Sequence, residues 1–171
     1  MALTDSFSGD IKASLIGKLR RTGGGSHTGV DSLASEPSFA LTDGTGANQA
    51  AGWFSATFTA TTGGVTISLA SATDPLGAAG DDTPTASPDE TQLRALLIYN
   101  RDTTNYVTVT KGANALTCLG TTPGIIIPAG GFFLLASPID GLGNMTDGTD
   151  DEIIVTANTA NCSCEITYVF G

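Results

Sequence analysis

From Trp53 onward, the chain consists of short segments rich in β-branched and aromatic residues, separated by clusters of Gly, Pro, Asn and Asp. Segments such as WFSATFT, GVTISLA, YVTVT and EITYVF alternate between apolar and polar residues. A period of two is typical of strands half buried in a sheet, and the segment spacing suits hairpins and Greek-key crossings. The sequence therefore predicts an all-β protein, an antiparallel β-sandwich or barrel.

The predicted strands lie near residues 38–42, 53–60, 65–70, 92–99, 106–110, 116–119, 125–127, 132–136, 153–157 and 164–170. Gly63 and Gly64 predict a hairpin turn between the strands at 53–60 and 65–70. Residues 73–90, rich in Asp and Pro, form the longest stretch without a predicted strand. A loop of this length is usually functional or disordered.

One parity of each strand should face the core of a half-buried sheet. On that basis the predicted core residues are Ile67, Leu69, Leu97, Tyr99, Val107, Val109, Phe133, Leu135, Ile154 and Val169. A register error of one residue would move a strand's whole apolar set to the other face.

Charge is distributed unevenly along the chain. Residues 1–21 carry four basic and two acidic residues, a net charge of +2, whereas the other 150 residues carry three basic and fifteen acidic residues, a net charge of −12. Phosphate contacts need clustered Lys and Arg, so the acidic body disfavours nucleic-acid binding. The basic N-terminal part could contact an acidic partner, or it could simply be a solvated strand.

We divide the chain into an N-terminal arm with a Gly-rich hinge, residues 1–37, and a β-sandwich body, residues 38–171. Residues 11–21 alternate apolar and polar side chains and favour a strand, although Ile11, Leu15, Ile16 and Leu19 also fit a helical stripe. The TGGGSHTG segment, residues 22–29, is flexible in composition and predicts a hinge or long loop.

No reactive constellation stands out, and we expect a non-enzymatic protein without cofactor or metal. The single histidine, His27, lies in the Gly-rich segment, which is a poor place for a catalytic triad. The acidic turn 147–152 could supply oxygen ligands to Ca²⁺, but an Asp-Gly turn before a strand explains it equally well. Cys118, Cys162 and Cys164 do not pair into a disulfide framework, so we interpret them as reduced and half buried, as in a cytosolic protein. Neither a signal peptide nor a membrane-spanning helix is expected.

Six phrases carry a resemblance to a known family: GDIKASLIGKL, LTDGTGANQAAGWF, ISLASATDPLG, LRALLIYNRDTTNYVTVTKGANAL, IIIPAGGFFLLASP and DEIIVTAN. In this order they resemble small virion proteins of tailed bacteriophages, typically jelly-roll head decoration or cement proteins. The resemblance runs nearly end to end and is greatest over residues 93–138. It implies a jelly-roll-like sandwich and a non-enzymatic structural role in the particle, and does not by itself distinguish head from tail. We favour the outer surface of the phage head, after synthesis in the bacterial cytoplasm.

The expected partners are the major capsid protein and further copies of the chain, as a dimer or trimer. The residues expected to bind the partner are Ile11, Lys12, Leu15, Lys18, Leu19, Arg20 and Arg21. Strand addition by this segment would supply main-chain hydrogen bonds, and its cations would attract an acidic surface. The alternatives are a tail or head-to-tail component, and a carbohydrate-binding sandwich on the particle.

Overall fold

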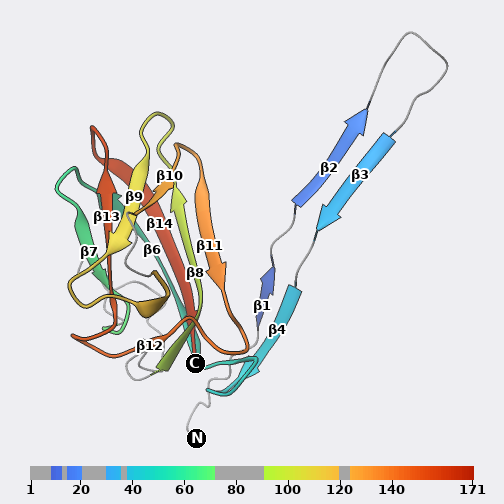
Figure 1. The fold of residues 1–171 in the computed structure, drawn as a ribbon, viewed down its shortest axis with the longest axis vertical. Helices are drawn as coiled ribbons and strands as arrows, with labels where there is room; N and C mark the ends of the chain where they lie inside the picture. Colours follow the sequence, from blue (N-terminus) through green and yellow to red (C-terminus); the bar gives the residue numbers. More distant parts are fainter. Residues whose placement is uncertain (1–8, 13–14, 21–29, 36–37, 72–90, 120–123) are drawn as a thin grey trace, which may run out of the picture.

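The body is an all-β sandwich of antiparallel sheets, which confirms the predicted fold class (Figure 1). The structure is a computed structural model that describes residues 9–12, 15–20, 30–35, 38–71, 91–119 and 124–171. Within these ranges, no helix is long and apolar enough to cross a membrane. The His27 segment and the whole of the predicted loop 73–90 lie in the intervals between these ranges.

Two main sheets form the sandwich. In the first, the strand order is β11–β8–β14–β6, and β12 pairs with the first two residues of β8. Its strands are β6 (Gly52–Ala60), β8 (Thr91–Asn100), β11 (Phe132–Ala136), β12 (Asn144–Met145) and β14 (Cys162–Phe170). The second sheet has the order β10–β9–β13–β7. Its strands are β7 (Val65–Ser68), β9 (Val107–Lys111), β10 (Ile125–Ile127) and β13 (Glu152–Ala157).

The strand pairs of the sandwich are nested along the chain. With the short β12 set aside, β6 pairs with β14, β7 with β13, β8 with β11 and β9 with β10, all antiparallel. The pairs β14–β8 and β13–β9 then join these ribbons into the two sheets. The first four of these strands thus pair in reverse order with the last four, and successive strand pairs lie in alternate sheets.

One continuous apolar core lies between the sheets, and it corrects part of the sequence prediction. Ile67, Leu69, Val107 and Val109 are buried as predicted, and Phe133 and Leu135 are half buried. The prediction was wrong for Leu97, Tyr99, Ile154 and Val169, whose strands bury the opposite parity. The buried residues there are Leu96, Ile98, Ile153, Val155, Tyr168 and Phe170.

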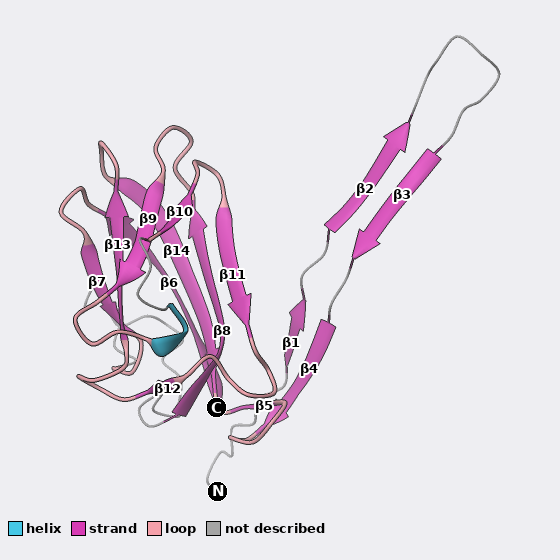
Figure 2. Cartoon of the chain, in the orientation of Figure 1, coloured by secondary structure: helices cyan, strands magenta, loops and turns pink. Residues whose placement is uncertain are grey.

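Two local predictions also need correction. The turn at Gly63 and Gly64 exists, with a hydrogen bond of 3.1 Å from Gly64 N to Thr61 O and a positive φ at Gly64 that favours glycine. It does not close a hairpin, because β6 and β7 lie in different sheets. The segment 116–119, predicted as a strand, contains a 3₁₀ turn at Thr117–Leu119 instead (Figure 2).

A two-stranded hairpin projects from one end of the body (Figure 1). Its proximal part pairs β1 (Gly9–Lys12) with β4 (Ser38–Asp43), and its distal part pairs β2 (Leu15–Arg20) with β3 (Val30–Ser35). The strand preference for residues 11–21 is thereby confirmed for the described residues. The short β5 (Gln49–Ala50) pairs in parallel with β4 and leads directly into β6.

Candidate functional site

Six of the seven predicted partner-binding residues lie in the described strands of the hairpin. Ile11 and Lys12 lie in β1, and Leu15, Lys18, Leu19 and Arg20 lie in β2. Arg21 lies outside the described residues. Sequence reasoning missed that residues 30–35 form the return strand of this hairpin.

The proximal hairpin has an apolar and a charged face. Ile11 is half buried and lies opposite Phe39 in the β1–β4 register, and Leu41 on the same strand is buried. Asp10 and Lys12, on the other parity, form an exposed ion pair of 2.8 Å. The hydrogen bond and charge of Asp10 raise the pKa of Lys12. Because Asp10 balances this ammonium, Lys12 has less free charge to offer an acidic partner than the sequence suggested.

The backbone edges of the hairpin are available for pairing. Among the described residues, β2 and β3 pair only with each other, and β1 is the outer strand of the order β1–β4–β5. An edge strand presents unpaired N–H and C=O groups that can template a further strand. The chemistry that this arrangement offers is main-chain recognition of an extended segment, with no reactive group required.

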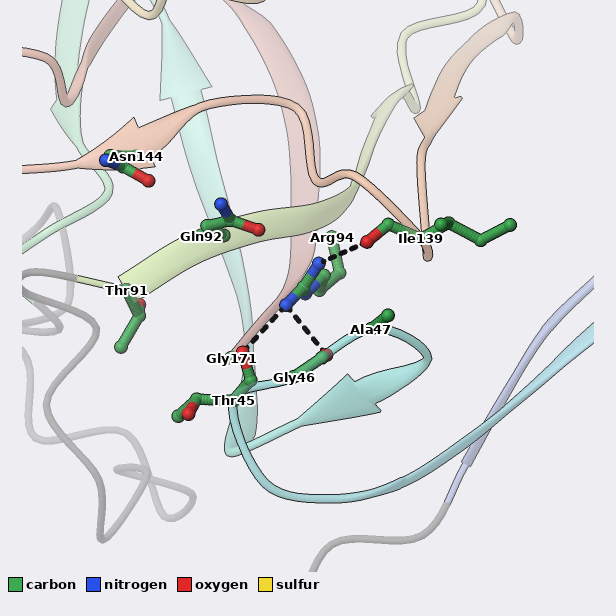
Figure 3. A pocket seen from close by; sticks show the side chains of 9 residues that line it. All are labelled: Thr45, Gly46, Ala47, Thr91, Gln92, Arg94, Ile139, Asn144 and Gly171. Carbon is green, nitrogen blue, oxygen red and sulfur yellow. Dashed lines mark hydrogen bonds between the residues drawn. The ribbon is translucent and has the colours of Figure 1, made fainter.

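The hairpin base is fixed to the sandwich by Arg94 (Figure 3). The β8–β14 register skips one residue, pairing Val169 with Ala95 and Phe170 with Leu93, so that Arg94 is the extra residue of a β-bulge. A bulge can redirect a side chain out of the strand's normal alternation. The Arg94 side chain is 1% exposed and points toward the loops that meet at this end of the body.

The guanidinium of Arg94 binds backbone carbonyls from two loops. Nη2 donates to the carbonyls of Thr45 and Gly46 at 3.0 and 2.8 Å, and Nη1 donates to the carbonyl of Ile139 at 3.2 Å. Burial lowers the pKa of Arg94. The side chain lines a recess of about 400 Å³, but its terminal nitrogens already donate to these carbonyls. Arg94 therefore acts as a clamp between the hairpin base and the 137–143 loop, and nothing in its sequence context signalled this role.

Main-chain bonds reinforce the clamp. Asn48 N donates to Pro138 O at 2.9 Å, and Ala51 N donates to Phe170 O at 2.7 Å. Gly44 N donates to Ala50 O at 3.1 Å, which holds the end of β4 against β5. The position of the hairpin is thus set by contacts with β8, β14 and the loop that follows β11.

The acidic turn at 147–152 serves the fold. Asp151 is buried and accepts a short hydrogen bond from the Ser68 hydroxyl, and Glu152 accepts a hydrogen bond of 3.1 Å from Asn114 N. Across the described ranges, no group of three or more His, Cys, Asp and Glu side chains could hold a metal ion. These contacts join the start of β13 to β7 and to the loop after β9.

The three cysteines are free thiols, and those of β14 face the core. Cys162 and Cys164 are buried on the same side of the strand, and Cys118 is half buried. Burial raises the pKa of all three thiols, that of Cys164 to about 11. Since the thiolate is the nucleophile, these residues are unreactive at neutral pH.

We expect the body to lose stability at alkaline pH. Burial raises the pKa of Cys164 from 9.0 to about 11 and also raises that of Tyr168, whose hydroxyl donates to Leu69 O at 2.9 Å. Both groups stay neutral in the folded protein while the unfolded chain ionises. The contribution of Cys164 is complete below about pH 9 and declines as the pH rises toward 11, and that of Tyr168 declines from about pH 10 upward. Urea denaturation across this interval should show a falling midpoint, with a shallower fall in Cys164→Ala. A midpoint that does not change up to pH 11 would contradict this assignment.

Comparison with known proteins returned no matching family model, no matching curated protein and no matching solved structure.

Proposed function

We propose that this chain is a non-enzymatic virion structural protein, a decoration or cement protein that binds the head shell of a tailed bacteriophage through its N-terminal hairpin. The observation that carries the proposal is the hairpin itself, with unpaired backbone edges in the described chain and a base clamped to a rigid sandwich by buried Arg94. A projecting arm of this kind suits strand addition to a neighbouring subunit.

The nested strand pairs support the finer proposal that the body is a jelly roll. Rolling up one long antiparallel ribbon places its successive pairs in alternate sheets, which gives an eight-stranded double-sheet sandwich. Jelly rolls serve as viral capsid domains and as lectin domains. The fold class is therefore compatible with the shell role and with the carbohydrate-binding alternative.

The partner we propose is the major capsid protein on the outer surface of the head. Main-chain hydrogen bonds would supply most of the affinity, and the basic residues of the hairpin would add an attraction that salt screens over a Debye length of about 8 Å at physiological ionic strength. A tail or head-to-tail component would use the same hairpin within a ring, so copy number distinguishes the two. Hundreds of copies per particle indicate the head, and about a dozen or fewer indicate the tail.

Removal of residues 1–21 is expected to abolish binding to undecorated heads, because β1 and β2 supply the strand proposed to add to the shell. Lys18, Arg20 and Arg21 changed together to Ala should only weaken binding and flatten its dependence on salt. Occupancy is measured by co-sedimentation with heads at several ionic strengths. Lys111→Ala, which removes an exposed cation from the body, is the matched control and should bind like the wild type.

The experiment distinguishes binding to heads through the N-terminal hairpin from binding through the acidic body. Circular dichroism and thermal melting check that the body of each variant remains folded. Deletion protein that coats heads at wild-type occupancy would overturn the proposal and assign the contact to the acidic body.

A further inference from the structure

The outer face of the sheet β11–β8–β14–β6 carries a cluster of apolar residues. The pairing register places Trp53, Leu97, Tyr99, Phe132, Leu134 and Val169 on the side away from the core, and we call these residues the outer apolar face. The same side of the sheet also carries the polar residues Ser55, Thr57, Thr59, Ser163, Glu165 and Thr167. Phe132 is 67% exposed, Trp53 42% and Tyr99 37%, and the other three are partly exposed. Trp53, Tyr99 and Phe132 are large exposed residues from three different strands, and the register pairs Tyr99 with Phe132, Leu97 with Leu134 and Trp53 with Val169, so they are not isolated exposed side chains.

The other sheet of the same sandwich does not share this property. Its outer face is a row of threonines on β7, β9 and β13, interrupted by half-buried Ile154 and by Ile126, which is 60% exposed. An antiparallel sheet with one solvated face is expected to be polar on that face, as here. The apolar exterior of the first sheet is therefore a feature of that face and not of the composition of the whole chain.

Charge on the outer apolar face is balanced. The strands β6, β8, β11 and β14 contain two charged residues, which are Arg94 and Glu165. Arg94 is buried and Glu165 is partly exposed. Arg101, just after β8, lies 3.5 Å from Glu165, so this ion pair leaves the face neutral. Because the whole chain has a net charge of −10, two copies repel each other, and a neutral apolar face is where that repulsion opposes contact least.

We propose that the outer apolar face packs against the same face of a second copy of this chain. A contact between identical patches closes on itself as a two-fold dimer, the commonest symmetry of soluble oligomers. Four strands about 4.8 Å apart and roughly 27 Å long have a flat footprint of roughly 500 Å². This footprint covers the whole face, polar residues included, and the side chains that project from it increase the area toward the roughly 800 Å² per partner of a standard interface, which also contains both polar and apolar residues. The inference is independent of the shell role proposed above, because it uses neither the hairpin nor a capsid partner.

Light scattering on the full chain tests the proposal. The wild type should have twice the 17.2 kDa mass of one chain. Phe132→Glu and Leu97→Glu place a carboxylate within the outer apolar face and should raise the dimer dissociation constant at least roughly tenfold. Ile126→Glu is the matched control, since it places the same charge at an equally exposed apolar residue on the opposite sheet, and it should leave the dimer intact.

Four results would overturn the proposal. They are a wild-type protein that stays monomeric from about 1 µM to about 1 mM, an oligomer larger than a dimer, a dimer unaffected by Phe132→Glu and Leu97→Glu, and equal dissociation by Ile126→Glu. Near-ultraviolet circular dichroism confirms that each variant remains folded. A monomer whose Trp53 fluorescence shifts on addition of a glycan would assign this face to sugar binding instead. Protein lacking residues 1–21 should still dimerise, so loss of head binding and loss of dimerisation can be separated.

Discussion

Leu96→Ala is expected to lower the free energy of unfolding by about 2 to 5 kcal/mol, because it removes a fully buried side chain and leaves a cavity between the two sheets. Its neighbour Leu97 points to the outer face and is half buried. Leu97→Ala should therefore cost less than about 1 kcal/mol in the monomer. Both variants are compared by urea denaturation in a Phe132→Glu background, so that association does not contribute.

The comparison tests the strand register directly. Leu96 lies opposite Tyr168 and Leu97 opposite Thr167 in the β8–β14 pairing. A one-residue shift of β8 would exchange the two environments and reverse the order of the two effects. Equal losses, or a larger loss for Leu97→Ala, would contradict the structure.

Arg94→Met is expected to destabilise the protein by about 2 to 4 kcal/mol. The change removes three hydrogen bonds from a charged donor to the carbonyls of Thr45, Gly46 and Ile139, at about 1.5 to 3 kcal/mol for each, and water replaces part of this because the three residues are exposed. Part of this cost is offset because a buried charge is removed as well. For that reason the net loss of stability is smaller than the sum of the contributions of the three hydrogen bonds.

Hydrogen exchange should locate the effect of Arg94→Met. The amides of Asn48 and Gly44, which hold the hairpin base, should exchange faster by more than the global loss of stability explains. The amides between β14 and β8 should follow the global change alone. Arg94→Lys is the matched control. A lysine keeps the charge but lacks the planar fork that reaches carbonyls in two loops, so this variant separates the loss of the hydrogen bonds from the loss of the charge. Stability and exchange rates equal to the wild type in Arg94→Met would show that the hairpin base does not depend on this clamp.

The sequence was sufficient for the fold class, because alternation and turn residues are local signals. Residues 107–110, VTVT, have apolar residues at one parity only, and the structure buries Val107 and Val109 as predicted. The strand assignment of residues 11–21 was likewise right for the described part.

The sequence did not determine which face is buried in every strand. The segment LRALLIY in β8 is apolar at both parities, and EIIV in β13 has adjacent Ile153 and Ile154. Period-two alternation cannot choose a face in such strands, so the choice depends on the partner strand and the opposite sheet. The same ambiguity hid the outer apolar face, since Leu97, Tyr99 and Val169 read equally well as core.

The sequence by itself determined an all-β chain with a basic N-terminal strand segment and an acidic body, because strand period, turn chemistry and charge are properties of short segments. Only the tertiary structure decided that residues 38–43 pair with β1, that Arg94 clamps the hairpin base, and that one sheet has an apolar exterior. These features join residues about 30 positions apart or more, such as Gly9 with Leu41, Arg94 with Ile139 and Trp53 with Val169. Pairing over such separations is fixed by the packing of the whole sandwich, which no short window of sequence contains.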